Sequence, residues 1–251
     1  MIIVDREAGT ISVDGRTMSL DTQEGFLALA DLWFHGAMRV KLAYSLTWLG
    51  RPVIQFADDL MRLQELVYRV QPDVILETGI AHGGSLIFHA GLCKLLDRGR
   101  VIGIDIDIRE HNRSAIEGHK LAPWISLFEG SSIDPAVVRA VKATIEPGET
   151  VLLVLDSNHS KAHVLAELEA WSDLVGVGSY IAVLDGYAME VAAGAPQAAP
   201  DWATNNPNAA VVEFVARRPE FRSVAGPLLF NESLLTEHVT GFRGGLIERI
   251  P

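Results

Sequence analysis

The chain has 251 residues, a formal net charge of −11 and a single cysteine, Cys93. This length fits one large domain, or one domain with an extra arm. Apolar residues make up 49% of the chain, which is enough to bury a sizeable core. The acidic balance and the lack of a basic run argue against a nucleic-acid-binding protein. An internal disulfide is excluded, and Cys93 lies in an apolar helical pattern that is typical of a small buried side chain.

The first seven residues, MIIVDRE, lack the basic and then apolar segments of a signal peptide. No window of the sequence approaches the length of uncharged apolar chain that a bilayer requires, so we expect no membrane-spanning helix. Together these features predict a cytoplasmic protein.

Residues 1–55 are predicted to form an N-terminal arm that precedes the main domain at 56–251. Residues 1–20 have the pattern of a β-hairpin, with β-rich runs at 2–4 and 10–13. The region 21–47 has a helical pattern, and its aromatic residues either line a substrate pocket, pack a dimer or pack on the core. A Gly-Arg-Pro sequence then breaks the helix before an amphipathic helix at 55–70.

Beyond residue 70, short apolar runs alternate with helical patterns, which indicates a parallel, doubly wound α/β sheet. The predicted strands cover 73–77, 101–105, 124–129, 151–155 and 179–184. The predicted helices cover 86–96, 108–120, the segment from 135 onward, 160–171 and 209–217. The tail is expected to supply the last strand or strands at 228–230 and 245–250. Residues 186–207 are rich in Ala, Gly, Pro and Asn and are predicted to be a lid or binding loop.

The chain is organised around the run DVILETGIAHGGS at 73–85. An apolar strand ends in Glu77, and Gly79, Gly83 and Gly84 follow before a helical pattern begins. Glycines in such a turn let the backbone approach a ligand, and the helix N-terminus offers free N–H groups. Ligands of open α/β sheets bind at the carboxyl ends of the strands, where this turn lies.

A second acid favours a nucleoside ligand. Asp105 ends the next predicted strand about 20 residues after the glycine pair, the offset at which an acid holds ribose hydroxyls. The pattern Gly-x-Gly-x-x-Gly is not met, which weakens a dinucleotide and leaves room for a nucleoside without pyrophosphate, such as S-adenosylmethionine. The alternative is a plain turn that binds no ligand. His82 in this turn either touches the cofactor or is solvated.

Four predicted strands end in acids, namely Glu77, Asp105, Asp156 and Asp185. In a doubly wound sheet these side chains converge on one edge, where carboxylates need a cation or hydrogen-bond donors. Asp156 and Asp185 are predicted to bind Mg²⁺ or a similar divalent cation. The alternative is that either acid caps a helix after its strand.

His159 and His163 follow Asp156 at a spacing that places both on one face of a helix. His159 is the candidate general base, because it lies nearest to the strand end and a neutral imidazole suits that role. We expect His163 to be structural. Ser131 and Ser132 follow the third strand, where they either contact a nucleobase or cap a helix.

Taken together, four blocks resemble the cephalosporin hydroxylase-like family of class I S-adenosylmethionine-dependent methyltransferases. They are TWLGRPVIQ at 47–55, ETGIAHGGS at 77–85, IDI at 104–106 and LDSNHS at 155–160. Weaker support comes from 205–214, and the resemblance runs from about Tyr44 to the C-terminus. Members of the family look like sugar O-methyltransferases and proteins from surface-polysaccharide gene clusters.

The resemblance implies a Rossmann-like class I methyltransferase sheet that binds S-adenosylmethionine and Mg²⁺. It implies methylation of a sugar hydroxyl, on a nucleotide sugar or on the sugar of a surface polysaccharide or natural product. Glu77 and Gly79 would face the methionine part of the cofactor, Asp105 would hold the ribose, and the turn at 130–132 would lie by the adenine. Asp156 and Asp185 would bind the metal. The predicted cofactor-binding residues are Glu77, Gly79, His82, Gly83, Gly84, Ser85, Asp105, Ile106, Gly130, Ser131 and Ser132.

Two departures from the family pattern affect the metal shell and the base. Relatives often carry two adjacent acids at the end of the fifth strand, whereas Leu184 precedes Asp185 here. Some related sugar methyltransferases have an acid two positions after the first metal ligand, and Asn158 takes that position here. The catalytic candidates are therefore Asp156, Asn158 and His159.

Other functions remain open at this stage. The missing glycine pattern argues against a nucleotide-dependent oxidoreductase, and the missing second acid favours a non-catalytic protein that uses the fold for assembly or sugar binding. A literal hydroxylase would need an iron triad, which His159, His163 and Asp156 imitate. The arm is expected to pair subunits, so we predict a dimer or a larger homo-oligomer.

Overall fold

A seven-stranded sheet forms the centre of the computed structural model, which describes residues 1–195 and 198–251. Its strands run in the order β11-β12-β10-β9-β6-β7-β8. They are β6 (Val74–Thr78), β7 (Arg100–Asp105), β8 (Ile125–Glu129), β9 (Val151–Leu155), β10 (Tyr180–Val183), β11 (Phe221–Ser223) and β12 (Leu246–Arg249). Strands β10, β9, β6, β7 and β8 pair in parallel, and β12 runs antiparallel to β10 and β11. The predicted doubly wound sheet is confirmed, and its strand order reverses between β6 and β9.

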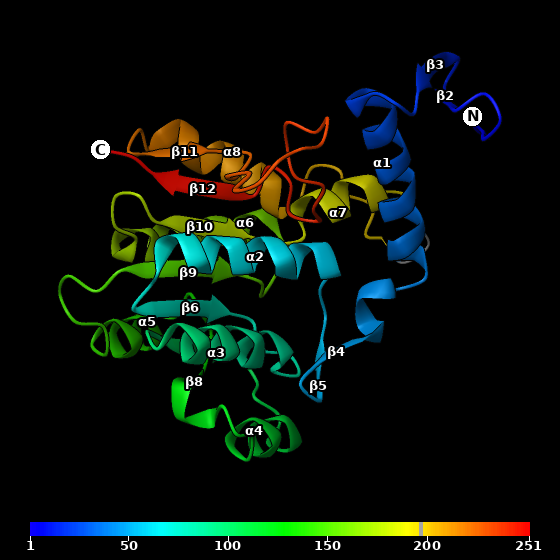
Figure 1. Cartoon of the computed structure of the whole chain (residues 1–251). Helices are drawn as coiled ribbons and strands as arrows, with labels where there is room; N and C mark the ends of the chain where they lie inside the picture. Colours follow the sequence, from blue (N-terminus) through cyan, green and yellow to red (C-terminus); the bar gives the residue numbers. More distant parts are fainter. Residues whose placement is uncertain (196–197) are drawn as a thin grey trace.

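Helices cover both faces of this sheet (Figure 1). They are α2 (Ala57–Val70), α3 (Gly84–Leu96), α4 (Glu110–Glu117), α5 (Pro135–Lys142), α6 (Lys161–Trp171) and α8 (Pro207–Arg217), with short 3₁₀ turns at Ala122–Trp124 and Ser172–Leu174. One core packs α2 and α3 on the sheet, and the other packs α6 and α8 on its opposite face. All five residues of β6 and of β9 are buried, which explains why β9 is an uninterrupted apolar run and why β6 begins with one before Glu77 and Thr78.

The N-terminal arm has a small sheet of its own. Strands β1 (Ile2–Asp5), β2 (Thr10–Val13) and β3 (Arg16–Ser19) are antiparallel, so the predicted hairpin is present and gains a third strand. Helix α1 (Gln23–Arg39) follows, and a 3₁₀ turn at Leu42–Ser45 comes after it. Strands β4 (Leu46–Trp48) and β5 (Arg51–Val53) then form a second hairpin that packs on α3. Figure 1 shows α1, β4 and β5 at the end of the sheet where the parallel strands terminate.

The second half of the chain differs from expectation in two places. Helix α7 (Gly186–Ala192) occupies the start of the predicted lid at 186–207, and residues 196–197 of that lid lie outside the described residues. Residues 228–230 were expected as a strand, and this expectation is wrong, because Leu229 and Phe230 are exposed in a loop. Strand β11 at 221–223 pairs with β12 instead. The predicted strand at 245–250 corresponds to β12.

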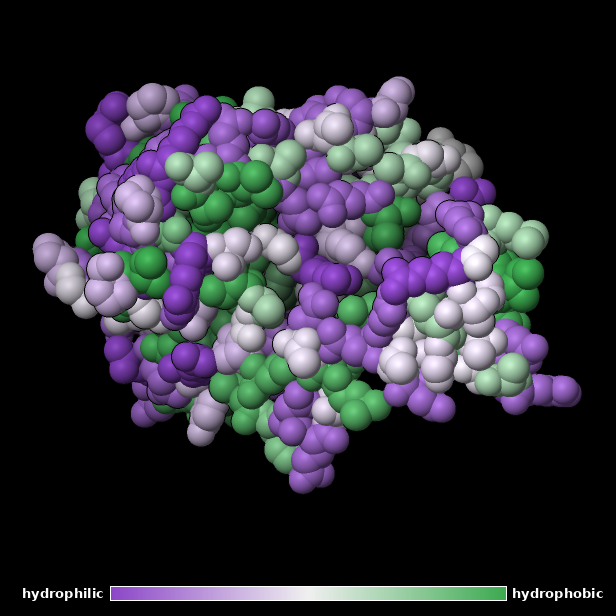
Figure 2. Space-filling model, turned by 90° about the horizontal axis from the view of Figure 1, so that it is seen from above, coloured by the Kyte–Doolittle hydropathy of each residue, from purple (hydrophilic) through white to green (hydrophobic). Residues whose placement is uncertain are grey.

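Among the described residues, no helix combines the length and the apolar character that spanning a bilayer requires. The face seen from above mixes hydrophilic and hydrophobic residues, without one hydrophobic area that covers it (Figure 2).

Candidate functional site

The predicted acids meet at one edge of the sheet. Strands β6, β9 and β10 are neighbours, so their carboxyl ends bring Asp156 and Asp185 together. One oxygen of each carboxylate and one ring nitrogen of His159 all lie within 4.8 Å of one another. His159 Nε2 is 4.0 Å from Asp156 Oδ1 and 3.8 Å from Asp185 Oδ2. These three residues form one cluster, which we call the acid cluster.

The two carboxylates of the acid cluster have His159 as their only ion-pair partner among the described residues. Burial raises the pKa of Asp156 well above its ordinary range, and the carboxylates of Asp185 and Glu77 raise it further. Gln55 Nε2 donates to Asp156 Oδ2 at 3.2 Å. Among the described residues, neither aspartate has a Lys or Arg partner. Carboxylate oxygens in this setting are ligands for a hard divalent cation, so the residues fit a metal.

Asp59 is another buried acid near the cluster, and the sequence analysis did not identify it. The residue is 4% exposed, and its Oδ1 accepts the N–H of Gly241 at 2.8 Å. Burial raises its pKa well above the usual range, and the charge of Asp185 adds to this effect. Asp59 belongs to the first turn of an amphipathic helix, where an acid is common for helix-dipole reasons, so its sequence context gave no signal.

Asp185 has an unusual backbone. It is the residue that caps α7, with φ 62° and ψ −4°, which is the left-handed region. Aspartate is one of the few residues with a side chain that visits this region routinely. The preceding Leu184 is buried in the core at 2% exposure, so the position before Asp185 supplies no second acid to the cluster.

The glycine turn lies directly beside the acid cluster. Gly79 has φ 91°, and a Cβ there would stand 2.1 Å from the backbone oxygen of Asp156. Gly84 opens α3, and a Cβ there would stand 2.1 Å from the backbone oxygen of Pro52 in β5. Only glycine permits either approach. A small cavity of about 30 Å³ remains between the turn, the arm and Asp156.

Asp105 holds this turn from the next strand. Its Oδ2 accepts the N–H groups of Ile80 and Ala81 at 2.7 Å and 3.2 Å. Its Oδ1 accepts the N–H of Asp107 at 3.1 Å. The predicted ribose acid thus shapes the loop that would receive a nucleoside, and its contact with ribose stays a prediction.

Two further side chains clamp the turn, and sequence reasoning assigned them no role. Arg51 of β5 donates from Nε to the carbonyl of His82 at 3.0 Å and from a terminal nitrogen to Asn112 Oδ1 at 3.0 Å. Asn112 Nδ2 donates to the carbonyl of Ala81 at 2.9 Å. The only signal for Arg51 was its place in the block at 47–55, and Asn112 had none.

Glu77 lies behind the turn. Its side chain is fully buried, Ser85 Oγ donates to Oε1, and Oε2 is 3.6 Å from His89 Nε2. Burial raises the pKa of Glu77 to about 8 and lowers the pKa of His89 to about 4. Ser85 lines the small cavity and so stands between Glu77 and that space.

The remaining predicted cofactor residues follow β7 and β8. Ile106 is 74% exposed, and Gly130 has φ 140° after β8. The Ser132 hydroxyl is engaged within the protein, because it donates to Glu167 Oε1 at 2.6 Å and lies 3.2 Å from His163 Nε2. His163 therefore belongs to a polar network with Ser132 and Glu167. Of the two serines, Ser131 is the more accessible.

A larger cavity of about 540 Å³ opens beside the acid cluster, and we call it the acceptor cavity. It is lined by Met38, Ala43, Tyr44, Ile54, Phe56, Ser157, Asn158, His159, Ser160, Asp185, Met189, Ala199, Asp201, Trp202 and Asn205. Its volume is in the range of small-molecule sites. The catalytic candidates Asn158 and His159, the arm and the predicted lid therefore face one space.

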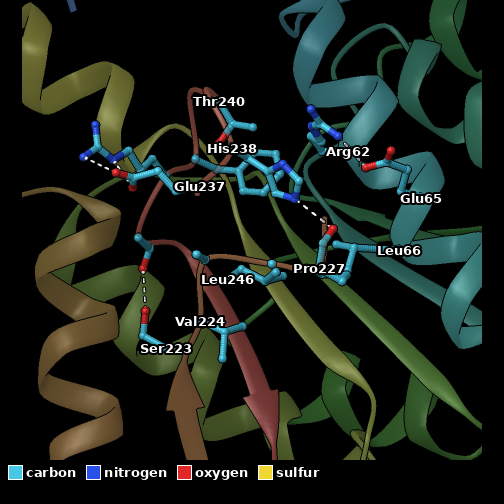
Figure 3. A pocket seen from close by; sticks show the side chains of 15 residues that line it. Arg62, Glu65, Leu66, Ser223, Val224, Pro227, Glu237, His238, Thr240 and Leu246 are labelled. Atoms are coloured by element: carbon cyan, nitrogen blue, oxygen red, sulfur yellow. Dashed lines mark hydrogen bonds and ion pairs between the residues drawn. The ribbon is translucent and has the colours of Figure 1, made fainter. Parts of the chain in front are cut away.

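A separate cavity of about 280 Å³ lies between α2 and the segments around β11 and β12 (Figure 3). Its charged groups pair with one another, Arg62 with Glu65 at 2.7 Å and Arg243 with Glu237 at 2.9 Å. His238 Nε2 is 3.0 Å from a backbone carbonyl. None of the predicted site residues lines this cavity.

Comparison with known proteins identifies relatives over most of the chain. The family model for rhamnosyl O-methyltransferase/CmcI matches residues 40–242. The rhamnosyl O-methyltransferase of Mycobacterium bovis (strain BCG / Pasteur 1173P2) is 27% identical over 157 residues, which are 61% of this chain and 60% of that protein. The rhamnosyl O-methyltransferase of Mycobacterium leprae (strain TN) is 27% identical over 156 residues, which are 61% of this chain and 64% of that protein. The match thus spans less than two thirds of these relatives' length.

Solved structures share the fold. CmcI with Mg and SAM has a TM-score of 0.57 at 20% identity, covering 83% of this chain and 78% of that chain. The O-methyltransferase TomG from Streptomyces achromogenes, in complex with SAM, has a TM-score of 0.51 at 19% identity, covering 78% and 81%. This likeness confirms the predicted class I methyltransferase sheet.

Proposed function

The chain belongs to the rhamnosyl O-methyltransferase/CmcI family, and from this premise we propose that it is an S-adenosylmethionine-dependent O-methyltransferase that acts on a sugar hydroxyl with a divalent metal ion. One observation carries the proposal. Gly79 and Ser85 of the glycine turn line the same small cavity as Asp156 of the acid cluster. A methyl donor in the turn and an acceptor at the acids would therefore be neighbours.

The cofactor is proposed to lie along the glycine turn. Gly79 and Gly84 let the turn lie directly against the backbone of Asp156 and Pro52, and the start of α3, whose N-cap Gly83 carries no side chain, offers free N–H groups. Asp105 uses its carboxylate on three backbone N–H groups, and its further lone pairs suit ribose hydroxyls. The turn at 130–132 and Ile106 would flank the adenine. S-adenosylmethionine supplies an activated methyl group.

The metal is proposed to bind Asp156 and Asp185. If a divalent ion were held there, it would supply a Lewis acid that lowers the pKa of a hydroxyl beside these carboxylates. Gln55 orients the Asp156 carboxylate through its hydrogen bond at 3.2 Å. Neither aspartate has a Lys or Arg partner among the described residues, and this supports the assignment, because buried carboxylates are costly without a cation.

His159 is proposed to take the acceptor's proton. Its ring nitrogen lies beside both aspartates and also lines the acceptor cavity. Asn158 Oδ1 accepts the N–H of Ser160 at 2.9 Å, which leaves its amide N–H groups available to an acceptor oxygen. Holding the hydroxyl in line with the methyl group supplies much of the rate.

Calorimetric titration tests the cofactor directly. S-adenosylhomocysteine and NAD⁺ would each be titrated into the protein, with Mg²⁺ and with EDTA. Binding of S-adenosylhomocysteine alone supports the proposal. Binding of NAD⁺ would favour the oxidoreductase, and binding of neither would favour the non-catalytic alternative.

We further propose that the protein is cytoplasmic and self-associates through its arm. Ile2 and Ile3 on β1 are 46% and 51% exposed, and β1 has an unpaired outer edge. Such edges are sites of pairing with another chain. Sedimentation velocity tests this, and a monomer across the micromolar range would contradict it.

A further inference from the structure

We propose that the cavity between α2 and the segments around β11 and β12 binds a small α-amino acid with an apolar side chain. The cavity is separate from the proposed methyl-transfer site, because none of its lining residues lines the cavity at the glycine turn or the acceptor cavity. Binding there is independent of the proposed function and can be measured without methyl transfer.

His238 gives this cavity a buried hydrogen-bond acceptor that has no partner. The residue is 8% exposed, and its Nε2 lies 3.0 Å from the carbonyl oxygen of Pro227, so Nε2 carries the ring proton. Burial lowers the pKa of His238, and the charge of Arg62 lowers it further, which favours the neutral ring. Nδ1 is then an acceptor, and it is buried without a hydrogen-bond partner among the described residues. Because an unpaired buried acceptor is costly, the site suits a ligand that brings an N–H or O–H group.

Arg62 and Glu65 of α2 lie on the side of the cavity that His238 faces (Figure 3). Arg62 Nη1 donates to Glu65 Oε2 at 2.7 Å, which is the one hydrogen bond of either side chain within the described chain. The other N–H groups of Arg62 and the second oxygen of Glu65 therefore remain available. By contrast, Arg243 contacts both carboxylate oxygens of Glu237, at 2.9 Å and 3.2 Å, so that pair is already complete.

The charges of the lining side chains favour a zwitterion. Two arginines and two glutamates line the cavity, so a ligand that carries one charge of each sign matches their balance. A carboxylate fits the free edge of the Arg62 guanidinium, which binds carboxylates through two parallel N–H groups. An ammonium group can donate to Glu65 Oε1 and to His238 Nδ1. An α-amino acid holds both groups on one carbon, as the closeness of these three side chains requires.

The rest of the cavity is apolar. Leu66, Val224 and Leu246 lie together below the polar groups (Figure 3). The cavity volume of about 280 Å³ falls just below the range of drug-sized sites. These walls therefore suit an aliphatic side chain of a few carbon atoms on the same ligand.

The wall opposite α2 is held in place by hydrogen bonds. Gly241 lies between the lining residues Thr240 and Phe242. Its N–H donates to Asp59 Oδ1 at 2.8 Å, and its carbonyl accepts the N–H of Ala188 at 2.9 Å. Thr240 and Phe242 are both buried. The cavity is thus preformed, which keeps the ordering cost of binding small.

Calorimetric titration with L-leucine tests the site. We expect one leucine to bind per chain, with the same affinity in the presence and absence of saturating S-adenosylhomocysteine. Competition between the two would place leucine at the methionine end of the proposed cofactor site and overturn the proposal. No binding of leucine at millimolar concentrations would also overturn it.

Two analogues of leucine test the zwitterion. The compound 4-methylpentanoate lacks the ammonium group, and 3-methylbutylamine lacks the carboxylate. Each should bind at least about tenfold more weakly than leucine, because each loses a charge-assisted hydrogen bond. Equal affinity for either analogue would exclude an α-amino acid as the ligand. This series needs no substitution, so it tests the site even if a variant folds poorly.

Two variants locate the bound leucine. Arg62→Met should weaken leucine binding about tenfold, and the matched control Arg69→Met, at an exposed position of the same helix, should leave it unchanged. His238→Gln keeps a donor that can reach the carbonyl of Pro227 and loses the Nδ1 acceptor. It should weaken leucine about tenfold and leave 4-methylpentanoate unaffected, a difference that a merely structural role would not produce. Unchanged leucine affinity in both Arg62→Met and His238→Gln would place leucine elsewhere and overturn the proposal.

Discussion

The carboxyl edge of the central sheet has two halves, and they differ in whether their polar groups have partners within the protein. On the β6–β7 half, Asp105, Arg51 and Asn112 satisfy the backbone of the glycine turn. On the β9–β10 half, Asp156 and Asp185 lie close together beside His159 and have no Lys or Arg partner among the described residues. The polar groups of the first half are hydrogen-bonded within the protein, whereas the two carboxylates of the second half have no Lys or Arg partner among the described residues. The proposed cofactor loop is therefore built from paired groups, and the proposed metal site beside it is built from unpaired ones.

The largest expected effect comes from removing charge on the unsatisfied half. Asp185→Asn keeps the shape of the side chain and tolerates the left-handed backbone. Methyl transfer should fall about 1,000-fold, while S-adenosylhomocysteine affinity is retained. Enzyme assays across a Mg²⁺ titration, with calorimetry in parallel, measure both quantities. The exposed Asp173, paired with Lys142, provides the matched control Asp173→Asn. Full activity in Asp185→Asn, or in wild type with EDTA, would sink the metal assignment.

Glu77 lies between the two halves and links stability to pH. Its pKa rises from 4.5 to about 8 on folding, so the folded chain keeps a proton that the unfolded chain releases. The metal-free protein should therefore lose stability as the pH rises from about 5 to about 8. Glu77→Gln has no proton to lose, so its advantage over wild type should grow with pH, reaching on the order of 3 kcal/mol near pH 7.

Urea unfolding in EDTA at several pH values measures this difference. The opposite trend belongs to His89, whose pKa falls from 6.5 to about 4 on folding, so its burial destabilises the protein as the pH drops through that window. A gap between wild type and Glu77→Gln that stays constant from pH 5 to pH 8 would rule out a raised pKa for Glu77.

Breaking the satisfied half should weaken cofactor binding and spare the metal. Arg51→Met removes the donors to the carbonyl of His82 and to Asn112 and leaves those acceptors unpaired. A loss of about 2 kcal/mol is expected, which is roughly 30-fold in S-adenosylhomocysteine affinity. Calorimetry measures the affinity, and Arg51→Lys, which keeps one donor group, should fall between. If Arg51→Met lowers only the thermal midpoint, the clamp serves folding and not the cofactor.

The smallest effect is expected at the lid. Asn205→Ala removes the acceptor for the N–H of Lys161, a loss of about 1 kcal/mol. The KM for the sugar should rise about fivefold, with unchanged cofactor affinity. Steady-state kinetics with each substrate varied in turn separate the two parameters, and a change confined to cofactor affinity would contradict the placement of the lid.

Local patterns were sufficient for most of the sheet. Strands β6 and β9 are buried on both faces, and a run of apolar residues that is followed by an acid was enough to predict each of them. Residues 228–230 have the same apolar character but no neighbouring strand, whereas β11 is a short segment defined by its register with β12. Strand propensity alone did not distinguish the two.

Sequence reasoning identified candidate site residues that lie at strand ends, and it missed residues of the same region whose contacts join distant segments. Asp156 and Asp185 follow strand ends, so topology alone brings them together. Arg51 and Asn112 are 61 residues apart, and their shared contact with the glycine turn exists only after folding. Glu77 was placed correctly at a strand end, but the sequence did not reveal that Ser85 would stand between it and the cavity.

The left-handed backbone of Asp185 also limits how this protein can evolve. At φ 62°, glycine, asparagine and aspartate are the residues that the fold accepts at little cost. Glutamate, an equally good oxygen ligand, is outside that group, so the acid that we propose as a metal ligand at this position has few substitutes. In relatives that have lost methyl transfer, we would expect asparagine or glycine at this position, because these residues keep the left-handed backbone and leave the fold intact.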